Sequence, residues 1–216
     1  MPITKQNILQ TLILSFIFIV LPAGSWYYLN QGFNYRKALI DELDQDLGSI
    51  PVFELTNQND QVITNKLLRG KVVIANFLSL KESAEQGRLI KDLVKVQDQF
   101  DKRDDIIFLT FTEANSPKQI STYFQQLQVK RNKNQWHFLT GLEATMKELT
   151  NEVNLPDNFQ KGYTDNATLI IADTSSTIRY AYDFREEAAV KKLIEHIAVL
   201  MPAVAKRELR ADKKEE

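Results

Sequence analysis

Two short, nearly uninterrupted apolar runs constrain the fold of this chain more than any other feature. Lys71–Leu78 reads KVVIANFL and Asp105–Thr112 reads DIIFLTFT. A strand with one exposed face alternates apolar and polar residues, whereas runs of this kind predict strands buried on both faces. Between them, Ser83–Phe100 carries apolar residues at steps of three and four, which predicts an amphipathic helix. The centre of the chain therefore has the alternation of an α/β domain.

Further elements are predicted on both sides of this centre. They are a hairpin over Phe53–Ile63 with its turn at Asn57–Asp60, a helix beginning at Ser116-Pro117, a short strand at Trp136–Leu139, a helix over Leu142–Val153, two strands at Thr168–Ala172 and Thr177–Tyr182 around a turn at Asp173–Ser176, and a closing helix over Glu186–Leu200. An α/β alternation followed by an antiparallel pair predicts a mixed sheet with helices on both faces, which is a thioredoxin-like arrangement.

The N-terminal part of the chain contains a long uncharged segment, Ile8–Tyr28. About 20 helical residues cross a hydrocarbon core of about 30 Å, so this segment is long enough to span a bilayer. Trp26, Tyr27 and Tyr28 follow the apolar run and are expected to lie at the membrane interface as an aromatic anchor. We therefore expect an N-terminal transmembrane helix, with the lipid bilayer as a partner.

A cleaved signal peptide is the alternative interpretation of the same segment. Lys5 would be its charged start and Ala23–Ser25 its small-residue cleavage site. The apolar run with its aromatic residues is long for a signal core, which favours the anchor. The expected organisation is a membrane anchor or signal segment at 1–29, a connector at 30–50, the thioredoxin-like domain at 51–201 and a charged tail at 202–216.

The chain contains no cysteine. This excludes disulfides, thiolate nucleophiles and thiolate metal sites within the chain. The formal net charge of −1 argues against a general nucleic-acid-binding protein, because such proteins usually carry a strong basic excess. No P-loop, dinucleotide-binding fingerprint or nucleophile elbow is present. We therefore expect no catalytic residues, no cofactor and no enzymatic activity.

Only two histidines, His137 and His196, are available as imidazole ligands. They lie on different predicted elements, so we expect no compact multi-histidine metal site. His137 is interpreted as a partly buried structural residue of its strand. His196 stands between Ile194 and Ile197 on the closing helix and is expected to face solvent.

Several segments together resemble the SCO/SenC family, the thioredoxin-like copper chaperones of cytochrome c oxidase assembly. The resemblance covers about Pro51–Leu200 and is carried by FELT at Phe53–Thr56, LRGKVVIANF at Leu68–Phe77, WHFLTG at Trp136–Gly141 and AAVKKLI at Ala188–Ile194. A membrane anchor before this domain is usual in the family. The resemblance implies a single-pass protein whose soluble domain is periplasmic or otherwise extracytoplasmic.

The family binds copper through a C-x-x-x-C motif and a distant histidine, and this chain departs from that pattern at every ligand. The two cysteine positions fall on Glu82 and Gln86, and the histidine position, seven residues before Asp173, falls on Asn166. Copper(I) is soft and selects thiolate and thioether ligands, whereas these side chains offer hard oxygens. We therefore predict that these former-ligand positions bind no copper.

Retention of the fold with loss of all three ligands leads to two functional hypotheses. The first is a non-catalytic interaction module, either an assembly factor or an accessory subunit of a respiratory membrane complex such as cytochrome c oxidase. Its expected partners are integral-membrane respiratory proteins. The alternative is a metal- or small-ligand-binding protein that uses a rewired pocket around Glu82, Gln86 and Asn166.

Overall fold

The computed structural model describes residues 13–78, 84–112, 119–120, 122–123, 125, 134–140 and 168–202. By its internal contacts the chain divides into two compact units, residues 1–42 and 43–216.

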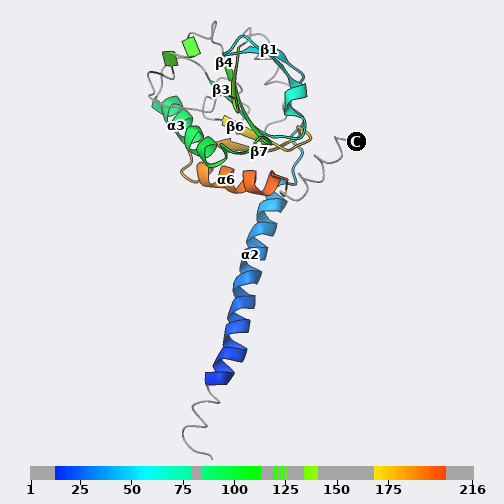
Figure 1. Ribbon diagram of the computed structural model, residues 1–216, viewed down its shortest axis with the longest axis vertical. Helices are drawn as coiled ribbons and strands as arrows, with labels where there is room; N and C mark the ends of the chain where they lie inside the picture. The colour runs from blue at the N-terminus through cyan, green and yellow to red at the C-terminus, as the bar shows by residue number, and fades with distance from the viewer. Residues whose placement is uncertain are drawn as a thin grey trace, which may run out of the picture. The chain divides into compact units, whose positions relative to one another are not determined.

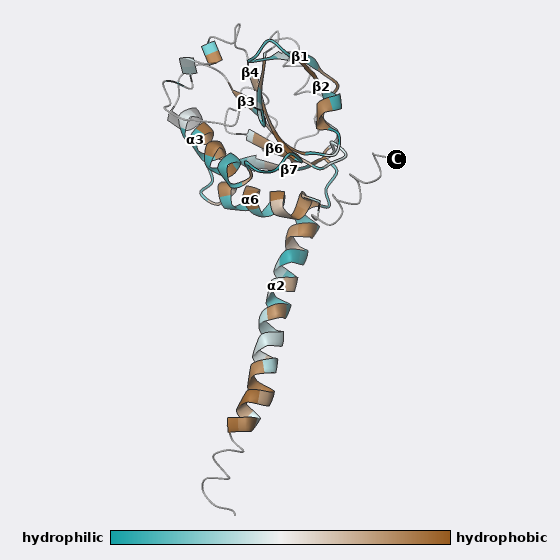
Figure 2. Ribbon diagram, in the orientation of Figure 1, coloured by the Kyte–Doolittle hydropathy of each residue, from teal (hydrophilic) through white to brown (hydrophobic). Residues whose placement is uncertain are grey.

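The first unit is built around a helix that runs from Ile13 without interruption. A π-helical turn, η1 (Phe16–Val20), precedes α2 (Leu21–Leu43). Pro22 explains this turn, because proline has no N–H to donate to the carbonyl four residues earlier and its ring needs extra room there. Figure 2 shows that the most hydrophobic part of the helix is its N-terminal part. The 31-residue helix is long and apolar enough to cross a membrane, and a signal sequence near the N-terminus passes the same test.

The second unit contains one sheet of seven strands in the order β2-β1-β5-β4-β3-β6-β7 (Figure 1). The strands are β1 (Glu54–Asn57), β2 (Val62–Thr64), β3 (Val72–Leu78), β4 (Ile106–Thr112), β5 (Trp136–Thr140), β6 (Thr168–Ala172) and β7 (Ile178–Asp183). The central strands β3, β4 and β5 are parallel to one another, and all other neighbours are antiparallel. The predicted mixed sheet is therefore confirmed, with its strands within two residues of their predicted positions.

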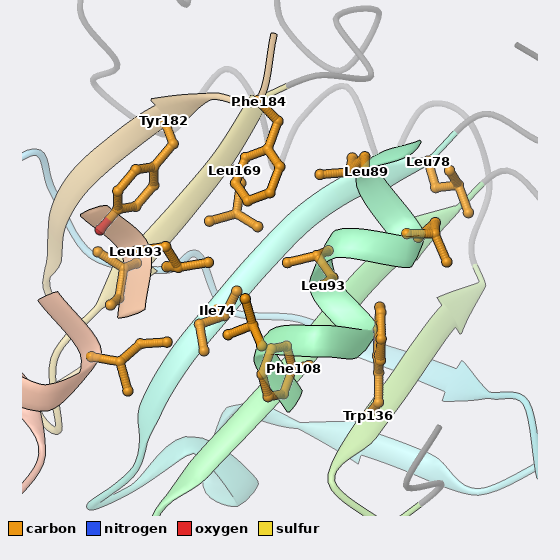
Figure 3. Packing of buried hydrophobic residues seen from close by; sticks show 14 of the residues in the cluster. Ile74, Leu78, Leu89, Leu93, Phe108, Trp136, Leu169, Tyr182, Phe184 and Leu193 are labelled. Atoms are coloured by element: carbon orange, nitrogen blue, oxygen red, sulfur yellow. The ribbon is translucent and has the colours of Figure 1, made fainter. Parts of the chain in front are cut away.

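Two helices cover one face of the sheet. They are α3 (Ala84–Gln99) and α6 (Ala189–Leu200). Figure 3 shows Leu89 and Leu93 of α3 lying over the strands that carry Ile74 and Phe108. The three- and four-residue spacing predicted this stripe, and Leu89, Leu93 and Val96 are all buried in the same cluster. The closing helix begins at Ala189 and not at the predicted Glu186, because the chain from Asp183 first makes two tight turns.

A second apolar cluster fills the opposite face of the sheet. It contains the alternate residues of the central strands, together with Phe53, Ile63 and Leu68 from the N-terminal hairpin and the short 3-10 helix η2 (Asn65–Leu68). Because the central strands carry apolar side chains on both faces, they read as continuous apolar runs in the sequence. Figure 1 shows the hairpin of β1 and β2 at one end of the curved sheet.

Residues just before the hairpin pair with the last strand. The Leu47 N–H donates to the Ile178 carbonyl at 3.0 Å, and the Ile178 N–H donates to the Gly48 carbonyl at 2.8 Å. Gly48 has a φ of 97°, a conformation that glycine adopts at little cost. Ile50 follows and is buried in the second cluster. This short stretch therefore adds backbone pairing along the outer edge of β7.

Some predicted elements lie outside the described residues. These are the helix over Leu142–Val153, the residues before Ile13 and the charged tail beyond Pro202. Of the helix predicted to begin at Ser116, Ile120 and Tyr123 are described, and both are buried in the cluster under α3 and α6.

Candidate functional site

The carboxyl ends of the three parallel strands form the edge at which an open α/β sheet usually binds its ligands. These strands end at Leu78, Thr112 and Thr140, and α3 follows β3 after a short connection. Of the three former-ligand positions, Gln86 is the third residue of α3. Glu82 and Asn166 lie outside the described residues. The assignment of these positions to one pocket therefore stays a prediction.

Asp173, seven residues after Asn166, directly follows β6. Its Oδ1 accepts hydrogen bonds from the backbone N–H groups of Ser175 at 2.8 Å and Thr177 at 3.1 Å. Its Oδ2 lies 2.8 Å from the guanidinium of Arg179. These bonds fix the turn between β6 and β7, where Ser176 adopts a φ of 66°. The structural role of Asp173 is thus to stabilise the turn between β6 and β7.

A buried chain of hydrogen bonds crosses the three parallel strands, from the first residue of β5 to positions two residues before the ends of β4 and β3. The indole Nε1 of Trp136 donates to Thr110 Oγ1 at 2.9 Å, and Thr110 Oγ1 donates to Asn76 Oδ1 at 2.8 Å. The three side chains are 0%, 0% and 2% exposed, respectively. Nothing in the residue spacing pointed to this relay, because its members are far apart in sequence and come together only through strand register.

His137 lies on β5 and is buried, in agreement with its interpretation as a structural residue. Its Nδ1 lies 3.2 Å from Nδ2 of Asn57, at the end of β1. Asn57 Oδ1 accepts from the backbone N–H groups of Asn59 and Gln61, so its amide nitrogen must face the imidazole. The amide therefore donates to Nδ1, which fixes the neutral imidazole with its proton on Nε2. This contact ties the N-terminal hairpin to the centre of the sheet.

The expectation that His196 faces solvent is wrong. The side chain is 0% exposed, and its Nδ1 lies 2.7 Å from the hydroxyl of Tyr182 on β7. The ring of Tyr180 packs edge-on against the imidazole, with 5.0 Å between ring centroids. The sequence did contain the signal, because position 196 lies three residues after the buried Leu193 and so shares its helix face.

Two ion pairs stand out in the electrostatics of the domain. The Asp105 carboxylate accepts two bonds from Arg103, at 2.8 and 2.6 Å, and this raises the pKa of the Arg103 guanidinium above its ordinary value. Arg185 donates to Asp183 at the end of β7 and lowers the pKa of the Asp183 carboxyl. Both pairs are local links at strand ends.

A metal site requires several converging ligands. Within the part of the chain that the structure describes, no three His, Asp or Glu side chains gather closely enough to hold a metal ion. Cysteine is absent from the whole sequence, so no thiolate can complete such a group.

Comparison with known proteins gives matches among solved structures only. No protein-family model matches the chain, and no curated protein matches it by sequence. Among the similar structures is a SCO1/SenC family lipoprotein from Bacillus anthracis str. Ames, with a TM-score of 0.58, 17% identity, and coverage of 73% of this chain and 98% of that one. The chain has a thioredoxin-like fold.

Two further structures support the same assignment of the fold. BsSco, a member of the Sco family of cytochrome c oxidase assembly proteins, matches with a TM-score of 0.57 and 16% identity over 71% of this chain and 94% of that one. A thiol:disulfide interchange protein of the thioredoxin family from Chlorobium tepidum matches with a TM-score of 0.55 and 14% identity over 74% and 99%. The thioredoxin-like fold is thus shared by chains of different activity.

Proposed function

We propose that this protein is a membrane-anchored, non-catalytic module that acts by contact with a respiratory membrane complex such as cytochrome c oxidase. The observation that carries the proposal is a thioredoxin-like fold in a chain without cysteine. Thiol–disulfide exchange requires an attacking thiolate, and copper(I) prefers sulfur ligands. Thiol–disulfide exchange and the copper binding that the resemblance implies are therefore closed to this chain, so we assign its function to protein contacts.

The N-terminal helix gives such a module a way to reach its partner. A single membrane span would hold the domain beside an integral-membrane complex and raise its effective concentration there. Trp26, Tyr27 and Tyr28 are 70%, 65% and 80% exposed, as expected of side chains that would lie at a membrane interface. By the resemblance to the SCO/SenC family, the soluble domain would be extracytoplasmic, and the protein would act as an assembly factor or an accessory subunit.

Affinity purification from mild detergent tests this proposal. The full chain carries a C-terminal tag, and the matched control carries the same tag on residues 1–42 fused to an unrelated soluble domain. We expect oxidase or other respiratory subunits to be recovered with the full chain and not with the control. Recovery of the full chain without any membrane protein would contradict the proposal, and equal recovery with the control would assign the contact to the anchor.

A rewired ligand pocket is the alternative function. Glu82, Gln86 and Asn166 offer one carboxylate and two amide oxygens, which are hard donors suited to cations such as calcium. Titration of the full chain with calcium and with copper(II), against a competing chelator, decides this point. The control is Glu82→Gln, which removes the only charge of the set. Saturable binding by the original chain that is lost in the control would establish the alternative, and absence of binding would exclude it.

A further inference from the structure

Asn76 is a buried amide that lies two residues before the end of β3. Its side chain is 2% exposed, and its Oδ1 is already occupied by the Thr110 hydroxyl. Among the residues that the structure describes, Nδ2 has no hydrogen-bond partner. Buried polar groups in native proteins nearly always have a partner, because leaving one unpaired costs its full desolvation free energy.

The direction of the relay shows that the unpaired end is a donor. The indole nitrogen of Trp136 can only donate, so Thr110 Oγ1 accepts from it and has its own hydrogen left to give. The Asn76 Oδ1 takes that hydrogen at 2.8 Å. The reverse orientation of the amide would leave both the Thr110 hydrogen and Oδ1 without partners. The observed orientation leaves only Nδ2.

The surroundings restrict what can bind to this donor. Ile74, Leu78 and Phe108 lie on the same face of the sheet and belong to one apolar cluster. Among the described residues, Asp105 is the only buried carboxylate and no Lys or Arg is buried. An anion would be uncompensated there, and burial of an unpaired charge is very costly. A metal ion is excluded as well, because an amide nitrogen has no lone pair to give.

We propose that Asn76 Nδ2 forms a binding site for one small, uncharged oxygen acceptor. The acceptor is an internal water molecule or the carbonyl oxygen of a small neutral molecule. The site lies just inside the carboxyl edge of β3 and β4, where Asn76 and Thr110 are paired in register. The site includes none of the former-ligand positions, so the outcome of its test does not depend on the function proposed above.

Nuclear magnetic resonance of the ¹³C- and ¹⁵N-labelled full chain in detergent micelles tests the site. The Asn76 side-chain amide signals are assigned through the carbon resonances of the same residue, and they should be missing from Asn76→Leu. Without additives, we expect a rotating-frame Overhauser contact between these amide protons and water. The sample is then titrated with formamide and with formate, which are similar in size but differ in charge. Formamide should shift the Asn76 amide and Trp136 indole signals saturably, and formate should not.

The two indole signals supply an internal control. Trp26 is 70% exposed on α2, so its signal should not follow the Asn76 signals in either titration. A water contact without a formamide shift assigns the acceptor to water, and a saturable formamide shift shows that neutral carbonyl compounds enter. Each result supports the site. Equal shifts with formate, or neither a water contact nor a shift, would overturn it.

A second measurement keeps the test decisive if Asn76→Leu fails to fold. A scalar coupling across a hydrogen bond, from the Asn76 amide nitrogen to a backbone carbonyl carbon, is measured in the unsubstituted chain. We expect no such coupling. Its detection would show that the chain itself supplies the acceptor, and the proposed binding site would be wrong.

Discussion

His196 on α6 and Tyr182 on β7 form a hydrogen-bonded pair in the interior of the domain, with 2.7 Å between the imidazole Nδ1 and the phenol oxygen. Their rings also pack at 5.8 Å between centroids. The pair lies among apolar residues of the cluster between the sheet and its helices, which include Leu193 and Ile197. The last helix is therefore held to the sheet by a specific polar contact in addition to apolar packing.

Removing the phenol oxygen should weaken this link. We predict that Tyr182→Phe lowers the free energy of unfolding by about 1–2 kcal/mol, because a buried partner of His196 is lost. Chemical unfolding of the detergent-solubilised chain measures the change. The control is Tyr28→Phe, the same substitution at a residue that is 80% exposed, and it should leave the stability unchanged. Equal stability of the two variants would mean that the pair contributes nothing.

Ile50 provides a test of where the folded domain begins. It is 7% exposed and packs in the second apolar cluster, whereas Val52, two residues later, is 89% exposed. We predict that Ile50→Ala lowers the free energy of unfolding by about 2–3 kcal/mol, the usual cost of truncating a buried isoleucine. Val52→Ala should cost almost nothing. If both variants unfold like the unsubstituted chain, Ile50 belongs to the connector at 30–50, as the sequence predicted.

The Asp183–Arg185 pair predicts a pH dependence at the acid end. Arg185 holds the pKa of the folded Asp183 below its ordinary value, so the pair stabilises the fold above the unfolded-state pKa near about 3.9. This contribution is lost as the pH falls through the lower, folded pKa. Because Arg185 is exposed, the effect should stay below about 1 kcal/mol. Between about pH 5 and pH 2, the free energy of unfolding of Asp183→Asn should therefore fall less steeply with decreasing pH than that of the unsubstituted chain.

A neighbouring carboxylate gives the control for that experiment. Glu187 is exposed, and Glu187→Gln removes the same charge a few residues away. Its acid dependence should match that of the unsubstituted chain. If Asp183→Asn loses stability with acid as steeply as the control does, the Arg185 contact does not stabilise the carboxylate.

The sequence predicted the positions of most strands along the chain, because the apolar character of a strand that is buried on both faces is a local signal. The runs at Val72–Leu78 and Ile106–Thr112 are buried almost throughout, so their apolar character alone identified them. The flanking residues Ile194 and Ile197 favoured an outward-facing His196, whereas its three-residue spacing from Leu193 places it on the buried face of the helix. The spacing indicates the buried face of the helix, but it does not identify the polar partner of His196, because Tyr182 comes from the neighbouring strand.

Contacts between residues that are far apart in the chain could not be predicted from the sequence. Asn57 and Gln58 were identified as turn residues, yet Gln58 donates to the Trp136 carbonyl at 3.0 Å and accepts from the Phe138 N–H at 2.7 Å. Its side chain thereby continues the pairing of β1 with β5. The candidate site could not be fully predicted for the same reason. The distance between Glu82 and Asn166 depends on how two segments far apart in the chain pack together.

Introducing the ligand types of the SCO/SenC pattern that the sequence resembles tests the predicted positions directly. We predict that the triple variant Glu82→Cys, Gln86→Cys and Asn166→His gains stoichiometric binding of copper(I), because two thiolates and an imidazole then suit the soft ion. The control moves the thiolate pair by one residue, as Ser83→Cys, Gly87→Cys and Asn166→His, at the same spacing. Competition with a copper(I) chelator should show binding at least about tenfold weaker in the control. Equal affinity in both variants would show that the three positions were assigned incorrectly.

The affinity of the unsubstituted chain for copper(I) tests most directly whether this thioredoxin-like protein works without metal chemistry. The chain is purified from membranes, its copper content is measured, and it is titrated with copper(I) against a competing chelator under anaerobic conditions. We predict a copper-free preparation and no complex tighter than micromolar, because the chain has no thiolate to offer. A stoichiometric copper complex that survives the chelator would contradict the account.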